Sequence, residues 1–113
     1  MNYPPGITSI ELVSGLGTTP AKVNRRTGEV YVNADFWNFL PDNVRYFILA
    51  HEAGHINLNT SNEHVADEWA FQHYVNEGRS LSDAVSSLDQ ILPLTTPEQN
   101  HRLMRMVRRA LSY

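Results

Sequence analysis

Residues 46–56 read Tyr46-Phe47-Ile48-Leu49-Ala50-His51-Glu52-Ala53-Gly54-His55-Ile56, and the rest of the predicted fold is arranged around them. Its apolar residues are typical of a buried helix, on which two histidines four positions apart lie on the same side, about one turn from each other. Both imidazoles can therefore bind one metal ion, and Glu52 projects from nearly the same edge, close enough to contact a water on that ion. Because a charged group inside a buried helix needs a compensating partner, the stretch predicts a metal site on this helix.

The spacing His-Glu-x-x-His is typical of zinc sites in which the glutamate is the general base of a hydrolysis. The same pattern also occurs by chance in unrelated proteins, so the alternative is a metal-free helical protein with a coincidental motif. Glycine destabilises a helix by about 1 kcal/mol relative to alanine. The place of Gly54 inside the motif therefore predicts close approach of a neighbouring strand or helix.

The composition of the 113-residue chain predicts one globular domain, residues 1–113. Hydrophobic residues make up 42% of the chain and aromatic residues 10%, which suits a single core. A formal net charge of -3 argues against a general nucleic-acid-binding protein. No apolar run reaches the roughly 18 residues of a membrane span, and the N-terminus lacks a basic region followed by an apolar run. We therefore expect a cytoplasmic protein that contacts no membrane.

The absence of cysteine limits the chemistry of any metal site. Without thiolate ligands, histidine and carboxylate side chains must hold the zinc, and this combination is typical of catalytic rather than structural zinc sites. A catalytic zinc takes three protein ligands and leaves a fourth position for water. The sequence must therefore supply one more donor near His51 and His55.

The candidates for the third ligand follow the motif after a short polar break: Glu63, His64, Asp67 and Glu68. If the next helix folds back antiparallel to the motif helix, a residue in its first turn reaches the level of His55, which favours Glu63. Asp67 lies one turn further along the same face, where it could accept the N–H of a ligand imidazole and fix the orientation of the ring. Asp67, His64 and Glu68 remain alternatives as the ligand itself.

Three stretches before the motif are typical of β-strands: residues 7–13, 21–24 and 29–33. Gly28 lies between the second and the third, and it can adopt the positive φ of a hairpin turn. In the third stretch Val30 and Val32 share one face, which we expect to pack against the motif helix. The segment before the motif thus predicts an antiparallel hairpin or sheet.

Residues 33–40 predict a short helical turn whose aromatic side chains are expected in the core rather than in a substrate pocket. These are Phe36, Trp37 and Phe39. The motif helix is expected over residues 42–59, and further helices are expected over residues 62–77, 80–92 and 96–111, with Pro93 ending the second of these. Thr96 and Gln99 have the spacing of a capping box. The predicted class is α+β, with the sheet packed on the motif helix and two to three helices after it.

Two segments together resemble a known class of zinc enzymes. His51-Glu52-Ala53-Gly54-His55, followed by Glu63-His64-Val65-Ala66-Asp67-Glu68-Trp69-Ala70, resembles the gluzincin pattern, and more closely the short ImmA/IrrE-like zinc peptidases of bacteria, phages and mobile elements. The resemblance covers residues 30–78. It implies a minimal zincin-like metallopeptidase in which Glu63 is the third zinc ligand and Asp67 supports a histidine. Residues 56–62 form a shorter connection than is usual in gluzincins, so it must be a bare turn.

The predicted reaction is zinc-dependent hydrolysis of a peptide bond, in which Glu52 takes a proton from water and passes it to the leaving amine. The resemblance implies a specific protein substrate, such as a repressor. A substrate strand could add to an open edge of the sheet. Four side chains are candidates for an oxyanion donor: Tyr46, His73, Tyr74 and His101. The alternative function is a non-catalytic zincin-like module that keeps the metal for stability or for protein–protein interaction.

The last predicted helix carries four arginines beside apolar residues: Arg102, Arg105, Arg108 and Arg109. We expect an amphipathic helix with a solvated basic face. A sharper hypothesis is that this face docks a regulatory protein, either one with an acidic surface or one bound to nucleic acid.

Overall fold

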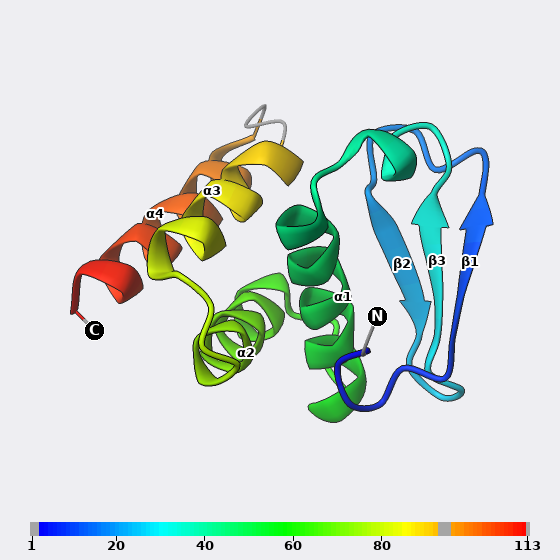
Figure 1. Cartoon of the computed structure of the whole chain (residues 1–113), viewed down its shortest axis with the longest axis horizontal. Helices are drawn as coiled ribbons and strands as arrows, with labels where there is room; N and C mark the ends of the chain where they lie inside the picture. The colour runs from blue at the N-terminus through cyan, green and yellow to red at the C-terminus, as the bar shows by residue number, and fades with distance from the viewer. Residues whose placement is uncertain (1–2, 93–95, 113) are drawn as a thin grey trace.

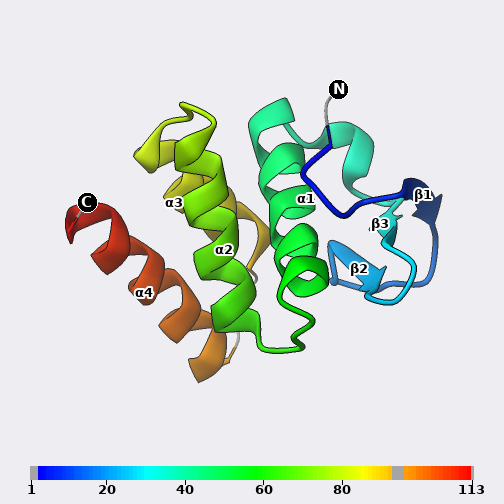
Figure 2. The same ribbon diagram turned by 90° about the horizontal axis from the view of Figure 1, so that it is seen from below.

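The computed structural model describes residues 3–92 and 96–112, and it has the predicted α+β architecture. Within these residues a three-stranded sheet precedes four α-helices, and helix α1 lies between the sheet and the other three (Figures 1 and 2). The elements follow in the order β1 (Ser9–Val13), β2 (Ala21–Asn24), β3 (Glu29–Asn33), the 3-10 helix η1 (Trp37–Phe39), α1 (Asp42–Asn57), α2 (Glu63–Asn76), α3 (Leu81–Ile91) and α4 (Pro97–Ser112).

The sheet has the strand order β1-β3-β2, so β3 is the central strand and β2 lies at an edge. β2 and β3 form the predicted antiparallel hairpin, with Gly28 at a φ of 78° in the turn. β1 pairs with β3 in the parallel direction, from Ser9 opposite Glu29 onward. This parallel pair was not predicted. It arises because residues 14–20 carry the chain past the position next to β1, which β3 then fills.

Helix α1 is buried along almost its whole length because other elements pack on two sides of it. On one side Val44, Ile48 and Leu49 contact the sheet through Val30 and Val32, and all five are at most 1% exposed. This confirms that these two valines face the motif helix. On the other side a second cluster joins α1 to the remaining helices, and its members include Phe47, Phe71, Tyr74, Leu88 and Met106. A helix that is apolar around most of its circumference is suited to this central place.

The helix termini follow the predicted signals with small shifts. The side chain of Asn62 caps α2 by accepting the backbone N–H groups of His64 and Val65, the second and third positions of the helix. Thr96 and Gln99 form the predicted capping box at the start of α4, each side chain accepting the backbone N–H of the other at 3.2 Å. The predicted helix end at Pro93 lies outside the described residues.

The three aromatic residues before α1 have different environments. Trp37 is 8% exposed and packs in the core, and Phe36 is half-buried. Phe39 is 86% exposed, so the prediction of a core position was wrong for this residue. Side chains two positions apart in a helical turn point in different directions, and the turn η1 has only one face against the core.

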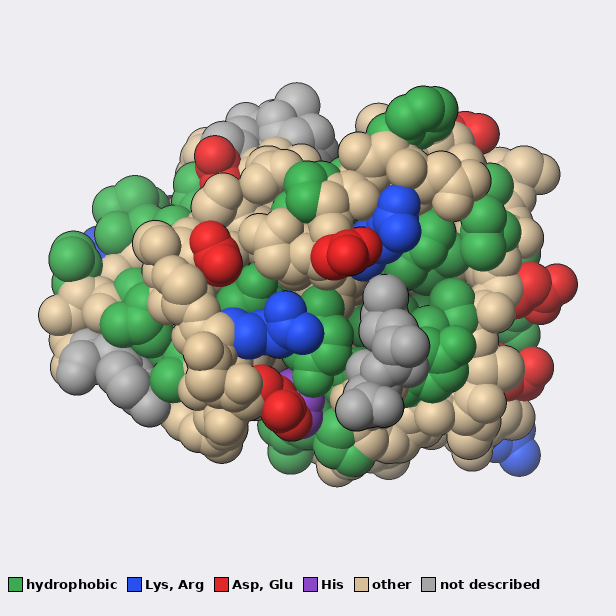
Figure 3. Space-filling view, viewed as in Figure 1, with side chains coloured by type: hydrophobic (Ala, Val, Ile, Leu, Met, Phe, Trp, Pro, Cys, Tyr) green, Lys and Arg blue, Asp and Glu red, His purple; other side chains and the backbone are tan. Residues whose placement is uncertain are grey.

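Hydrophobic side chains appear at several places on the molecular face drawn in Figure 3.

None of the helices in the described part of the chain combines the length and the hydropathy that a bilayer crossing requires.

Candidate metal centre

The two histidines of the motif lie one turn apart on α1 and turn their rings toward each other. Their ring centroids are 4.7 Å apart with an interplanar angle of 83°, and their Nε2 atoms are 3.0 Å apart. Both residues are buried, with His51 6% and His55 7% exposed. The side chains of the helix therefore present two ring nitrogens at one point, as the spacing predicted.

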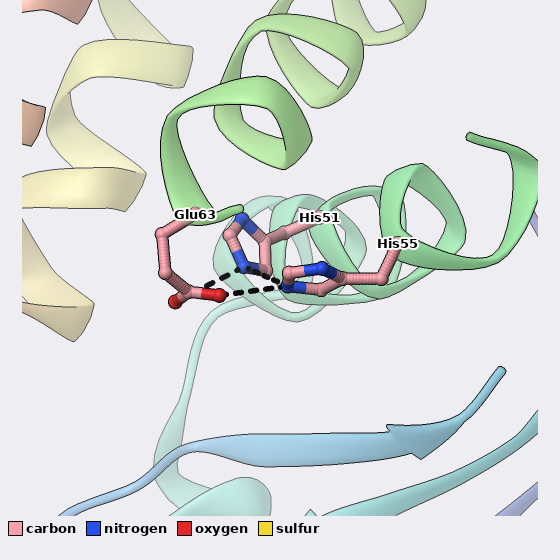
Figure 4. A group of neighbouring side chains, drawn as sticks. All are labelled: His51, His55 and Glu63. Carbon is pink, nitrogen blue, oxygen red and sulfur yellow. Dashed lines mark hydrogen bonds and ion pairs between the residues drawn. The ribbon is translucent and has the colours of Figure 1, made fainter. Parts of the chain in front are cut away.

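Glu63 reaches the same point from the first turn of α2. Its Oε1 lies 2.8 Å from Nε2 of His55, and its Oε2 lies 3.6 Å from Nε2 of His51. One donor atom from each of the three residues lies within 4.8 Å of the others, an arrangement that could hold a metal ion (Figure 4). Of the four candidates for the third ligand, Glu63 is thus the one that the structure groups with the two histidines.

Gly54 permits the close approach of α2 that brings Glu63 into place. A Cβ atom on Gly54 would lie 3.0 Å from the backbone oxygen of Ala66 and 3.1 Å from its Cα. Distances this short are rare between real atoms, so the two helices could not pack as they do with a larger residue here. The prediction that the backbone at Gly54 closely approaches a neighbouring element is confirmed.

The other nitrogen of each ring is also engaged. Nδ1 of His55 donates to the backbone oxygen of Thr60 at 2.7 Å. Nδ1 of His51 lies 2.8 Å from Oδ1 of Asp67, although the ring N–H does not point straight at that oxygen, so the contact is a bent one. Protons on both Nδ1 atoms leave the Nε2 lone pairs free in the neutral rings. Asp67 occupies the supporting position that the sequence suggested.

The donor set fits a zinc ion. Two Nε2 lone pairs 3.0 Å apart and a carboxylate 2.8 Å from one of them would repel each other unless a cation or protons lay between them. Two imidazoles and one carboxylate, with no thiolate, are a known ligand set of catalytic zinc.

The pKa values show how strongly the site attracts positive charge. Burial alone would lower the pKa of His51, but its contacts with Asp67 and Glu63 outweigh burial and raise this pKa to about 9. His55 is also buried, and its contact with Glu63 raises its pKa in the same direction. Burial opposes the ionised form of Glu63, yet the two histidines hold the pKa of this carboxyl group well below its usual range. Without a metal, protons therefore occupy the site.

Glu52 lies between the two histidines in sequence and lines two cavities beside them. It is 6% exposed, but it lines two neighbouring cavities of about 200 and 300 Å³, and Glu63 lines both as well. Burial raises the pKa of the Glu52 carboxyl group, and the nearby histidines partly counteract this effect. The cavities give water a route to the carboxylate.

Arg102 is a residue of the site that the sequence did not reveal. We expected it on a solvated basic face, but it is 9% exposed and contacts both Asp67 and Glu63. The prediction was wrong because Arg102 lies four positions before Met106, on the buried side of α4. That spacing from an apolar residue was the available signal. Arg105 and Arg108 are exposed as expected, and docking of a partner on this face stays a prediction.

The remaining candidates lie away from the cavities at the centre. His64 lines neither of the two cavities that contain Glu52, and Glu68 forms an ion pair with Arg109 at 2.7 Å. None of the four suggested oxyanion donors lines the two cavities that contain Glu52. The hydroxyl of Tyr46 instead pairs with Nε2 of His73 at 3.1 Å.

Comparison with known proteins adds no relative, because no family model, curated protein or solved structure matches the chain.

Proposed function

We propose that the chain is a zinc-dependent peptidase of minimal gluzincin type, in which His51, His55 and Glu63 hold the metal and Glu52 is the general base. The observation that carries the proposal is the convergence of three donor atoms within 4.8 Å at the edge of cavities that Glu52 also lines. The sequence resemblance to ImmA/IrrE-like peptidases supports the same function and a protein substrate. A cytoplasmic location is part of the proposal.

Zinc at this site would supply Lewis-acid chemistry, making water more acidic and polarising a carbonyl group. Glu52 accepts the proton of the attacking water and delivers it to the leaving amine. Its pKa, raised by burial, moves toward the neutral range in which one carboxyl group can both accept and release a proton. Asp67 orients the His51 ring through Nδ1.

Among the described residues β2 pairs with one strand only, β3, and its other edge supports a peptide as the substrate. The backbone oxygen of Pro20 accepts the N–H of Asn33 on β3. Because hydrogen bonds to one neighbour alternate along an antiparallel strand, the backbone groups of Ala21 and Val23 point toward the open edge. Ala21 lines both cavities that contain Glu52. An extended peptide added to this edge would pass beside the carboxylate.

One observation favours the alternative, a metal-binding module that acts through protein–protein interaction. The suggested oxyanion donors lie away from the cavities at the centre, so no side chain among them is placed to stabilise a tetrahedral intermediate.

Glu52→Gln distinguishes the two functions. The wild-type protein and this variant are each loaded with zinc, analysed for metal content and incubated with a library of peptides of defined sequence, whose products are identified by mass spectrometry. A peptidase gives cleavage by the wild type, no cleavage by the variant and equal zinc content. A binding module gives equal zinc content and no cleavage by either protein. Absence of stoichiometric zinc from the wild type overturns both functions.

A further inference from the structure

All three nitrogens of the Arg102 guanidinium contact carboxylates at the candidate metal centre. Nε donates to Oδ2 of Asp67 at 2.7 Å, and Nη2 donates to Oδ1 of the same residue at 2.8 Å. Nη1 lies 3.1 Å from Oε2 of Glu63. The planar fork of arginine matches one carboxylate with two parallel bonds and leaves a third nitrogen for another, which lysine cannot do.

Each of these carboxylates also contacts a histidine. Oδ1 of Asp67 lies 2.8 Å from Nδ1 of His51, and Oε1 of Glu63 lies 2.8 Å from Nε2 of His55. Arg102 thus contacts Oε2 of Glu63, while Oε1 of the same carboxylate lies against the His55 ring. The orientation of both carboxylates, and through them of the rings, depends on a residue of the C-terminal helix.

The guanidinium also offsets part of the negative charge at the centre. Glu52, Glu63 and Asp67 carry three negative charges when ionised, and Arg102 supplies one positive charge among them. With both histidines neutral, the charge left over is the charge that one divalent cation balances. Buried charges are stable only when they are paired in this way.

We propose that Arg102 is a positioning residue of the metal centre, which sets the affinity for a divalent cation by fixing Asp67 against His51 and one oxygen of Glu63. The inference rests on the zinc-binding part of the proposed function and is independent of hydrolysis. Helix α4 is then part of the metal centre rather than only a cover for the core.

The test compares Arg102→Gln and Arg102→Lys with the wild-type protein, using zinc alone as the probe. Zinc affinity is measured by competition with a chromophoric chelator. Loss of a partner behind the ligands lowers metal affinity by about 10- to 100-fold, which is the effect expected for Arg102→Gln. Arg102→Lys keeps the charge but loses the fork, so we expect an intermediate loss. The visible absorption of the Co²⁺ form is expected to change in both variants, because Glu63 is no longer held.

Arg109 offers a matched control on the same pair of helices. Its Nε donates to Glu68 at 2.7 Å and its Nη2 donates to Gln72 at 2.8 Å, so it also joins α4 to α2, but away from the histidines. Arg109→Gln is expected to leave zinc affinity and the Co²⁺ spectrum unchanged. Circular dichroism of the metal-free proteins shows whether each variant folds, and Arg102→Lys decides the question if Arg102→Gln does not.

Zinc affinity within twofold of wild type in a folded Arg102 variant overturns the positioning role. An equal loss of affinity in Arg109→Gln overturns it as well, because docking of α4 alone would then explain the effect. Failure of the proposed function gives different results: wild-type protein that binds no zinc removes the metal centre itself, whereas zinc binding without hydrolysis leaves the role of Arg102 standing.

Discussion

The Nε2 atoms of His51 and His55 lie 3.0 Å apart, while Nδ1 of each ring is turned toward an oxygen atom. Two neutral imidazoles in this arrangement direct lone pairs at one point, and Oε1 of Glu63 directs another from 2.8 Å away. Such a point has a strong preference for a cation. Without a cation, repulsion between these lone pairs would destabilise the folded protein. Bound metal or protons remove this repulsion.

Zinc is therefore expected to stabilise the folded protein. Ligand that binds only the folded state at 100 times its dissociation constant adds about 2.7 kcal/mol to the free energy of unfolding. We expect zinc to raise the melting temperature of the wild-type protein and to leave that of His55→Ala unchanged. Differential scanning calorimetry with and without a chelator measures the effect, and an equal rise in both proteins would show that zinc binds elsewhere.

The stability of the metal-free protein is expected to fall as the pH rises from 6.5 to 9. The pKa of His51 is raised from its ordinary value of 6.5 to about 9 in the folded state. The stabilisation from its proton is complete below pH 6.5 and is lost as the pH passes through about 9. Zinc competes with this proton, so the rise in melting temperature on adding zinc should grow over the same interval. Thermal melts at several pH values, with and without zinc, measure both trends. His51→Gln should reduce the loss of stability of the metal-free protein between pH 6.5 and 9.

The candidate metal site could be predicted from the sequence where its residues lie close together along the chain. His51, Glu52 and His55 lie within one turn of a helix, and the short turn after them restricts where Glu63 can lie. Arg102 is distant in sequence, and its contact with Asp67 depends on how α4 packs, which spacing within one helix does not determine.

The sheet also shows that pairing between distant segments is harder to predict than local pairing. The hairpin of β2 and β3 is local and was predicted, with Gly28 at its turn. The parallel pairing of β1 with β3 joins segments on either side of that hairpin, and no local pattern encodes it. Phe39 was placed in the core on its hydrophobicity alone, although its direction depends on which side of the turn η1 faces the protein.

The two aromatic residues of that turn should respond differently to substitution. Trp37 is 8% exposed, and its backbone oxygen accepts from Nε of Arg45 at 2.8 Å. Trp37→Ala is expected to lower the free energy of unfolding by about 3–5 kcal/mol, because it leaves a cavity in the core. Phe39 is 86% exposed, so Phe39→Ser should change it by less than about 0.5 kcal/mol. Urea denaturation of both variants measures the difference, and a large loss for Phe39→Ser would contradict the exposed position.

Gly54→Ala is expected to weaken both the fold and zinc binding. Alanine would favour the isolated helix by about 1 kcal/mol. Its Cβ, however, would lie 3.0 Å from the backbone oxygen of Ala66, which cannot move without shifting α2. Overpacking of this kind costs about 1–3 kcal/mol, so the free energy of unfolding of the metal-free protein should fall despite the gain in helix propensity. Because a shift of α2 also carries Glu63 away from His55, zinc affinity should fall too. Urea denaturation and chelator competition measure the two effects, and a variant that is more stable than wild type with unchanged zinc affinity would show that the helices can separate without disturbing the site.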